Sequence, residues 1–179
     1  MADLEILTVH DPEQLKILRS KSRKVRAVTP SLVALAHRML ETMRRANGVG
    51  LAAPQVGVLQ RFFVAELPAD EENNRPAETY IVFNPEIVKK RGEDVGYEGC
   101  LSIPGYIGEV ARAEKVVVKG LDERGKVVRY RLEGYIARVF QHEIDHLDGI
   151  LYTDRLTSME TFRPVEEGQE EAAEMEAAR

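Results

Sequence analysis

The clearest pattern of apolar and polar positions lies between residues 30 and 46, where apolar side chains recur at helical spacing. The apolar stripe consists of Leu32, Leu35, Ala36, Met39, Leu40 and Met43. Thr29 can serve as the N-cap, and Pro30 suits the first position of a helix. Gly48 follows at a position where glycine commonly ends helices. The pattern predicts a scaffold helix over this segment.

Two further segments are expected to be helical. Residues 11–19 can form a short helix with Asp11 as its N-cap. A second long helix is predicted from about residues 132–134, through YIARVFQHEIDHL, to Leu147. Gly149 follows it and is expected to end it.

Strand-like runs occur at residues 61–65, 79–84, 115–121 and 127–132. DERG at 122–125 separates the last two runs and predicts a hairpin turn. GVGLAAPQVG at 48–57 is rich in Gly and Ala, so we expect irregular, tightly packed chain there. The polar, Pro-bounded stretch 67–78 predicts a surface loop.

These elements predict an α+β fold in one domain, residues 1–163. Small antiparallel β-sheets should pack around a central helix, and a second helix should lie nearer the N-terminus. Residues 164–179 lack an apolar face and are expected to form an acidic tail, either frayed helix or disordered. No internal repeat is found.

Charge and composition narrow the possible functions. The chain carries 30 acidic and 25 basic residues, and residues 166–179 alone hold six Glu and one Arg, so the rest of the chain is neutral overall. We find no nucleic-acid-binding motif and no apolar run long enough for a membrane span. The N-terminus lacks the pattern of a secretory signal, which predicts a cytoplasmic protein. With Cys100 as the single cysteine, no intrachain disulfide can form.

The strongest chemical signal is HEIDH at 142–146. His142 and His146 are four residues apart and therefore lie on one face of a helix, where two imidazoles can bind one metal ion. Glu143 lies between them, where it can reach a water activated by that metal. The alternative is a pair of surface histidines with an incidental glutamate.

A catalytic metal needs a third protein ligand and an open position for water. Tyr152 stands where metzincin proteases place a third histidine, and the downstream glutamates of a gluzincin-like site would fall in the weakly patterned tail. The remaining candidates are His10, His37 and Cys100. Cys100 lies in YEGCLSIPG, where flanking glycines and a proline indicate close backbone approach. A Cys/His/His set with a fourth open position suits Zn²⁺ or Fe²⁺.

Three segments, in this order along the chain, resemble the three motifs of the peptide deformylase family. They are GVGLAAPQVG, EGCLS and QHEIDHLDG, and the resemblance extends from about residue 4 to about residue 156. It implies hydrolysis of the formyl group from N-formylmethionyl nascent polypeptides, with release of formate. The implied partners are formylated nascent chains at the ribosome, and the implied native ion is Fe²⁺, with Zn²⁺, Ni²⁺ or Co²⁺ as alternatives.

The resemblance also implies roles for single residues. Cys100, His142 and His146 match the family's metal ligands, and Glu143 matches its general base and acid. The Gln55 amide and the Leu101 N–H match groups that hydrogen-bond the formyl oxygen. The peptide-binding backbone positions correspond to Val49, Gly50 and Gly99.

The methionine side chain of the substrate is expected in an apolar pocket beside the metal-binding helix. Tyr135, Val139 and the stem of Arg138 share the helix face of the ligands, although Tyr135 and Val139 could equally be plain core. The Arg138 guanidinium is expected in water or in an ion pair.

At one position this chain differs from some relatives: they carry an arginine that contacts the bound peptide backbone, and this chain has Ile107. Binding of the substrate backbone beyond its first residue is therefore expected to be weaker or to use other groups. Glu98 and Arg112 could form a buried pair that braces the cysteine segment, or a surface pair.

Two other functions stay open at this point. One is an HExxH zinc endopeptidase, which requires Cys100 to lie far from the two histidines. The other is a non-enzymatic domain whose structural zinc is closed by a fourth protein ligand. Release of formate, against internal cleavage of an unformylated peptide, separates the enzymatic readings.

Overall fold

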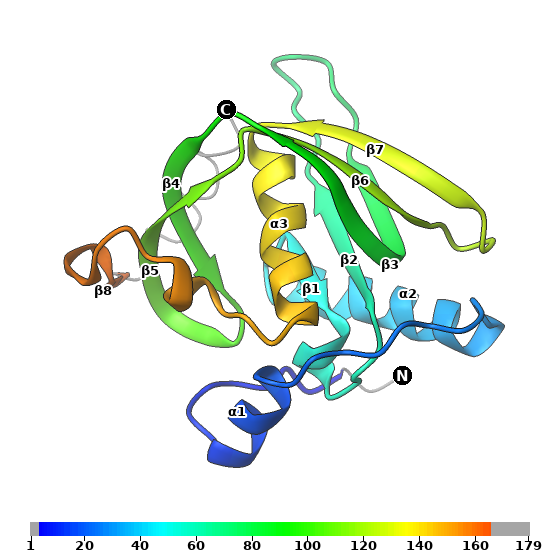
Figure 1. Cartoon of the computed structure of the whole chain (residues 1–179), viewed down its shortest axis with the longest axis horizontal. Helices are drawn as coiled ribbons and strands as arrows, with labels where there is room; N and C mark the ends of the chain where they lie inside the picture. The colour runs from blue at the N-terminus through cyan, green and yellow to red at the C-terminus, as the bar shows by residue number, and fades with distance from the viewer. Residues whose placement is uncertain (1–3, 166–179) are drawn as a thin grey trace.

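The computed structural model of the chain describes residues 4–165 and confirms an α+β fold with antiparallel strand pairing (Figure 1). A five-stranded sheet has the order β1-β2-β3-β6-β7, formed by Gly50–Ala52, Phe62–Leu67, Glu78–Arg91, Lys115–Leu121 and Val127–Glu133. A three-stranded sheet consists of β4 (Asp94–Cys100), β5 (Ile103–Arg112) and β8 (Arg163–Pro164). The helices are α1 (Pro12–Leu18), α2 (Pro30–Arg45) and α3 (Tyr135–Leu147), and short 3₁₀ turns cover Ala53–Val56, Tyr152–Arg155 and Met159–Thr161.

Helix α3 is the centre of the molecule. It runs between the β4–β5 pair and the five-stranded sheet (Figure 1), and every residue from Ala137 to Leu147 is buried. Val139, Phe140 and Ile144 pack in one apolar cluster with side chains of the large sheet. Polar residues on a helix buried this deeply must find partners inside the protein. That requirement concentrates the chemistry of the chain along α3.

Strand β2 separates two cores because its side chains alternate between the faces of the sheet. Phe63 and Ala65 belong to the cluster with α3, whereas Phe62 and Val64 belong to the cluster with α2. Helix α2 therefore covers the opposite face of the sheet from α3, and its apolar stripe packs against that face, as expected of a scaffold helix. The sheet between the two helices is held on both sides and gives α3 a rigid base.

The predicted caps of the first two helices are confirmed. Asp11 accepts hydrogen bonds from the N–H groups of Glu13 and Gln14 at 2.8 and 3.3 Å, and Thr29 accepts one from Leu32 at 3.3 Å. The predicted end of α2 at Gly48 is wrong by one residue. Asn47 adopts the left-handed conformation, with φ of 56°, because its short polar side chain tolerates that region better than most.

Gly149 ends α3 as predicted, in a Schellman arrangement. Its φ is +72°, and the N–H groups of Gly149 and Ile150 donate to the carbonyls of His146 and Asp145 at 3.1 and 3.0 Å. A Cβ added to Gly149 would lie 2.3 Å from the carbonyl oxygen of Arg19. Glycine is thus required here for two reasons: the backbone is left-handed, and the backbone of Arg19 lies too close to leave room for a side chain.

Gly149→Ala is therefore expected to lower the free energy of unfolding by about 2 kcal/mol or more, since it combines left-handed strain with a backbone clash. Gly105→Ala is the matched control: its φ is +80°, but nothing lies within 4 Å of an added Cβ, so about 1 kcal/mol is expected. Denaturant unfolding at constant m-value measures both. Equal losses in the two variants would show that the contact with Arg19 is unimportant.

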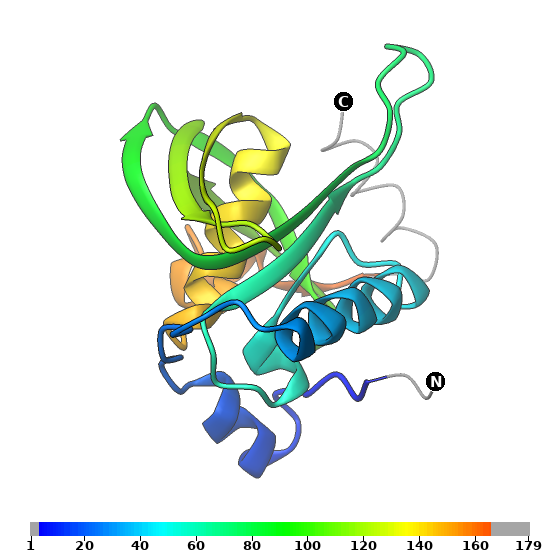
Figure 2. The same ribbon diagram turned by 90° about the vertical axis from the view of Figure 1, so that its right-hand side faces the viewer.

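The four predicted strands are present, and the 122–125 turn closes the β6–β7 hairpin. The loop after β2 stands away from the body (Figure 2). Three features differ from the prediction: β3 continues to Arg91, β4 and β5 are strands, and 48–57 contains β1 and a 3₁₀ turn rather than only irregular chain. Strand β4 alternates exposed and half-buried residues with only Glu98 buried, so its local pattern carries little strand signal.

Strand β8 pairs with β5, and the next residue, Val165, donates its N–H to the carbonyl of Gly105 at 3.0 Å. The first two residues of the predicted tail, 164 and 165, therefore lie against β5. The rest of the predicted acidic tail lies outside the described residues, so the domain boundary at 163 stays a prediction. In the described part of the chain, no helix has both the length and the apolar character needed to cross a membrane.

Candidate metal centre

Cys100, His142 and His146 converge at one point, although the cysteine and the histidines come from different elements. The sulfur lies at the end of β4, and the two imidazoles lie one turn apart on α3, with ring centroids 5.0 Å apart. One ligand atom from each residue lies within 4.8 Å of the other two, and the Cys100 sulfur is 3.3 Å from His146 Nε2. This is the convergence that the sequence pattern and the resemblance imply.

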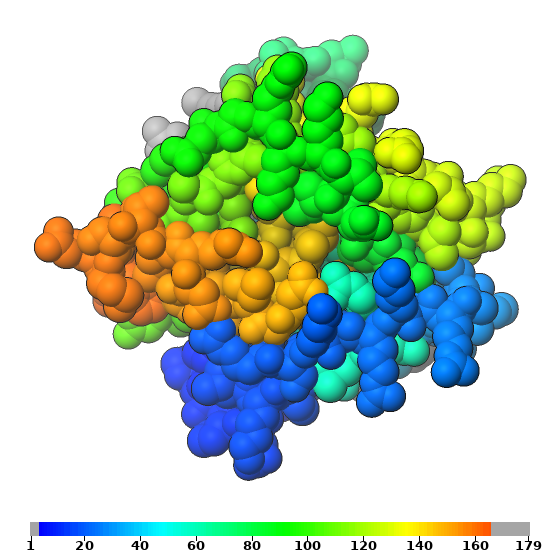
Figure 3. All heavy atoms as spheres, viewed as in Figure 1, coloured from blue at the N-terminus to red at the C-terminus, as the bar shows by residue number. Residues whose placement is uncertain are grey.

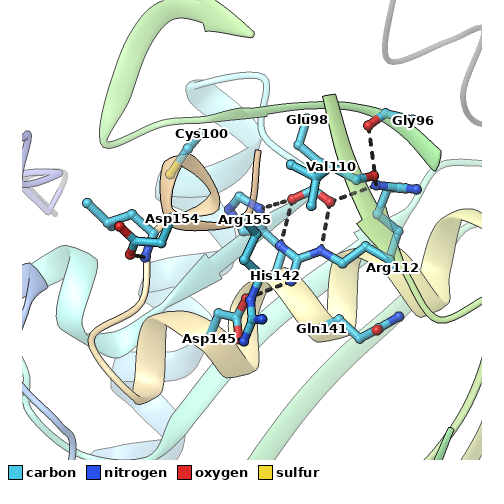
Figure 4. Close-up of polar contacts among 12 residues, drawn as sticks. Gly96, Glu98, Cys100, Val110, Arg112, Gln141, His142, Asp145, Asp154 and Arg155 are labelled. Carbon is cyan, nitrogen blue, oxygen red and sulfur yellow. Dashed lines mark hydrogen bonds and ion pairs between the residues drawn. The ribbon is translucent and has the colours of Figure 1, made fainter. Parts of the chain in front are cut away.

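Glu98 fixes the orientation of His142. The Nδ1 of His142 lies 2.7 Å from Glu98 Oε1, and a carboxylate partner there places the hydrogen on Nδ1 (Figure 4). The lone pair of the ring's Nε2 is then free to bind a metal. A histidine ligand held by a carboxylate in this way is common in metal sites, because the carboxylate both orients the ring and raises its basicity.

The carboxylate of Glu98 is itself held by two buried arginines. Arg112 Nε and Nη2 each donate to it at 2.8 Å, and Arg138 Nη1 donates at 2.8 Å. The Glu98–Arg112 pair is buried, with about 5% of each side chain exposed, so the surface alternative is excluded. Burial alone would raise the pKa of Glu98, but hydrogen bonds from Arg112 and His142 outweigh it and hold that pKa well below its usual range.

The residues fit a bound divalent cation. Thiolate sulfur and imidazole nitrogen are the donor types that zinc and iron(II) prefer. Desolvation alone would lower the pKa of His142, but hydrogen bonds with Cys100 and Glu98 raise it well above normal, whereas desolvation holds the pKa of His146 well below normal. In the part of the chain that the structure describes, no fourth side chain joins this group. Three ligands and an open position are the pattern of a catalytic site rather than a structural one.

Glu143 is buried beside these ligands and has an unused acceptor. Only 3% of the residue is exposed, and its Oε2 has no hydrogen-bond partner among the described residues. Burial raises the pKa of Glu143 to about 7, against the weaker opposing effect of charge on His142. A carboxylate with such a pKa can both take and return a proton near neutral pH.

Gly50 makes room for that carboxylate. A Cβ added at Gly50 would lie 2.4 Å from Glu143 Oε1 and 2.8 Å from its Cδ. The first motif therefore contributes space at this position, in addition to any backbone contact with substrate.

Gly50→Ala is expected to displace the carboxylate of Glu143 by a fraction of an ångström or more, and so to lower the rate of a reaction in which that carboxylate moves a proton by about 10²-fold. Metal content should stay unchanged, since no ligand moves. Gly105→Ala is the control, because its added Cβ touches nothing. A Gly50→Ala protein with wild-type kcat and KM would mean that Glu143 needs no such space.

Gln55 is held with its amide nitrogen toward the sulfur. Its Oε1 accepts the N–H of Ala52 at 2.9 Å, and its Nε2 lies 3.1 Å from Ser102 Oγ and 3.6 Å from Cys100 Sγ. The residue is almost fully buried on the 3₁₀ turn after β1. An amide held in this way keeps its N–H donors beside the metal ligands, where they can hydrogen-bond an oxygen bound next to the metal.

One pocket of about 570 Å³ opens onto the centre, although His146 is not among its lining residues. The residues singled out from the sequence that line it are Val49, Gly50, Gln55, Glu98, Gly99, Cys100, Leu101, Tyr135, Arg138, Val139, His142 and Glu143. His37 lies outside this group on the exposed side of α2, where it pairs with Glu123 at 2.6 Å. Ile107 also lines the pocket, as do the exposed residues Tyr97 and Tyr106.

The guanidinium of Arg138 is expected either in water or in an ion pair, and the structure shows it in ion pairs. Arg138 is 4% exposed, and its guanidinium donates to Glu98, to Asp94 and to the carbonyl of Val110. These contacts direct its charge toward β4 and β5. A role in substrate binding through its stem stays a prediction.

Sequence reasoning missed most of the charge network around Glu98. Asp145 accepts hydrogen bonds from Arg112 at 2.6 Å and from Arg155 at 2.6 and 2.9 Å (Figure 4). No local pattern marks these partners, because the four elements involved meet only in the fold. The single available signal was chemical: a histidine ligand usually needs an oxygen partner for its second nitrogen.

The geometry decides between the readings left open by the sequence. Cys100 lies beside His146 rather than far from it, which removes the condition for the endopeptidase reading. Tyr152, at the metzincin histidine position, is buried with its ring facing His142 at 6.0 Å between centroids.

Comparisons with known proteins agree with this geometry. A family model described as polypeptide deformylase matches residues 3–162. A peptide deformylase of Thermomicrobium roseum is 47% identical over 97% of this chain and 97% of its own, and one of Symbiobacterium thermophilum is 51% identical over 99% of this chain and 76% of its own. The crystal structure of the Thermotoga maritima peptide deformylase has a TM-score of 0.79 and 40% identity over 88% of this chain and all of its own. The chain therefore belongs to the peptide deformylase family.

Proposed function

We propose that the Cys100/His142/His146 centre and Glu143 carry out the reaction of this family, hydrolysis of the formyl group at the N-terminus of nascent peptides. One observation carries the proposal: three ligand atoms lie within 4.8 Å of one another, and two of these ligands, Cys100 and His142, line the same pocket as Glu143, a buried carboxylate with an unused oxygen. Acyl hydrolysis needs a nucleophilic water, a group that moves its proton, and donors for the developing oxyanion.

The chain's own residues supply the proton transfer and part of the oxyanion stabilisation. Glu143 accepts a proton from the attacking water and returns it to the leaving amine, for which its pKa of about 7 is suited. The Gln55 amide and the Leu101 N–H donate to the formyl oxygen as negative charge grows there. Because Ala52 holds Oε1 of Gln55, the amide nitrogen is already turned toward the site before substrate binds.

Cys100, His142 and His146 would hold one divalent ion, and we propose Fe²⁺, with Zn²⁺, Ni²⁺ and Co²⁺ as ions that the same ligands accept. When bound, the ion lowers the pKa of water and polarises a carbonyl group. Glu98 supports the site by keeping His142 in the tautomer that leaves Nε2 for the metal.

The substrate is an N-formylmethionyl peptide that lies along the rim of the pocket. Backbone groups of Val49, Gly50 and Gly99 are proposed to hold it as an added strand, a common mode of peptide binding. Tyr135 and Val139 are proposed to receive the methionine side chain. The reaction is proposed to take place in the cytoplasm, on chains that are still at the ribosome.

The test is a product assay on protein purified without oxygen, with metal content measured on the same sample. A formyl-Met peptide should yield formate and a peptide with a free N-terminus, and the same peptide without the formyl group should stay intact. Internal cleavage of the unformylated peptide, with no formate from the formylated one, would overturn the proposal in favour of an endopeptidase.

A further inference from the structure

A run of basic residues on the N-terminal side of the molecule has no part in the metal centre. Residues 14–40 contain seven lysines and arginines and no aspartate or glutamate, although the chain outside the last 14 residues is neutral overall. The core of this run is the segment that joins α1 to α2. We call residues 21–26 the basic strip; its cations are Lys21, Arg23, Lys24 and Arg26.

The cations of the basic strip are free to meet a partner. All four are exposed, and they form no ion pair with any residue between 4 and 165. Long side chains of this N-terminal region project into solvent in Figure 3. By contrast, Arg19, just before the strip, is paired with Asp154. The strip therefore presents uncompensated positive charge.

The backbone of the strip is fixed to the body of the protein. The N–H of Ser22 donates to Leu147 at 2.8 Å, and Arg23 exchanges backbone hydrogen bonds with Leu59 and Arg61 at 3.0 and 2.8 Å. The Asn84 side chain bonds both backbone groups of Val25 at 2.8 Å. The cations thus project from an ordered, extended segment, which reduces the entropy lost when they bind.

An open cleft lies beside the strip. Arg23, Lys24 and Arg26 line it together with Thr29, Ser31, Leu59 and Gln60, and no carboxylate is among its lining residues. The 16-residue helix α2 begins at this cleft and has no acidic residue in its first turn, so its dipole adds to the positive potential. Cations, hydroxyl groups and a helix start around one cleft suit phosphate groups.

We propose that the basic strip and this cleft bind the phosphate backbone of RNA. Several cations in a row match a chain of regularly spaced phosphates better than a single small anion. A lipid surface is a poorer fit, because the apolar residue of the strip, Val25, is buried and no apolar side chain of the strip is left to insert.

Binding at the strip leaves the metal centre open. The cleft and the pocket around the metal ligands share no lining residue, so a peptide can enter the pocket while RNA occupies the cleft. The choice of RNA as partner rests on the proposed function, because a nascent chain emerges from an RNA-rich particle. The strip would hold the enzyme near that particle without taking part in hydrolysis.

The experiment measures binding of the full chain to a labelled RNA duplex between 50 and 200 mM salt. The triple variant Arg23→Gln/Lys24→Gln/Arg26→Gln is compared with Arg129→Gln/Arg131→Gln, which removes exposed arginines from β7. The triple variant should raise Kd at least about tenfold at low salt and reduce the slope of log K against log salt by about 2 to 3, while the control keeps wild-type binding.

Two further readouts make each outcome decisive. Formate release from a free formylated peptide and thermal unfolding should be the same in all three proteins, so a failure of RNA binding is distinct from a failure of the proposed function. No RNA binding by the wild type, or an equal loss in the β7 control, would overturn the proposal. Tighter binding to phosphatidylglycerol vesicles than to RNA would overturn it in favour of a membrane surface.

Discussion

Glu143→Gln is expected to reduce formate release by about 10³-fold or more, within the range that a single general base or acid contributes. Glutamine has the size of the glutamate but cannot accept the proton of the attacking water. The residue lies on α3 between the two histidine ligands and is itself not one of the group of three. Metal content should therefore stay at the wild-type level.

The measurement is kcat/KM for a formylated peptide together with the metal-to-protein ratio of the same preparation. Glu133→Gln is a suitable control, because it changes an exposed glutamate on the strand before α3, paired with Lys115 at 3.1 Å. Activity near that of the control would remove Glu143 from the mechanism. Loss of metal along with activity would make it a ligand rather than a base.

Glu98→Gln is expected to give the largest loss of stability, about 3 kcal/mol or more. The variant keeps the shape of the side chain but leaves Arg112 and Arg138 buried with less opposing charge. Removing one partner of a buried ion pair typically costs this much, because the remaining charge has already lost its water.

Denaturant unfolding of the metal-free proteins measures this loss without a contribution from metal binding. Asp94→Asn is the matched control: Asp94 pairs with the same Arg138 at 3.0 Å, but about half of its side chain is exposed, so less than about 1 kcal/mol is expected. Similar losses in the two variants would mean that the burial of Glu98 does not increase its contribution to the free energy of unfolding. The Glu98 variant should also bind its metal more weakly, since His142 loses its carboxylate partner.

The parts of the fold that could be predicted from sequence are those with a local physical signal. Asp11 and Thr29 mark helix starts because a cap bonds residues two or three positions away. The apolar stripe of α2 and the glycine after α3 are likewise local. Asn47 was missed as the end of α2 because glycine is the commoner left-handed residue and Gly48 stood next to it.

Strands β4 and β5 had no such signal, because their exposed positions and glycines break the alternation that marks a strand. They form because β4 pairs with β5 through a tight turn after Cys100, and this pairing is seen only in the structure. The same strands carry Cys100 and Glu98. The HEIDH motif therefore identified two ligands from spacing alone, whereas the third came from family resemblance.

The carboxylate partner of His142 shows the limit of sequence reasoning most clearly. Glu98 is 44 residues from that histidine and reaches it only because β4 packs against α3. A possible pair with Arg112 could be suggested from the sequence, but not the second arginine or the link to Asp145. Such networks are set by how the elements pack, so they are found in the structure and not in a local pattern.

The most direct test of the account is titration of metal-free protein with Fe²⁺ under anaerobic conditions, with formate release from a formyl-Met peptide measured at each addition. Activity should rise in proportion to added metal and level off at one ion per chain. Activity that is already full in the metal-free protein, or that requires more than one ion per chain, would contradict a single catalytic ion held by Cys100, His142 and His146.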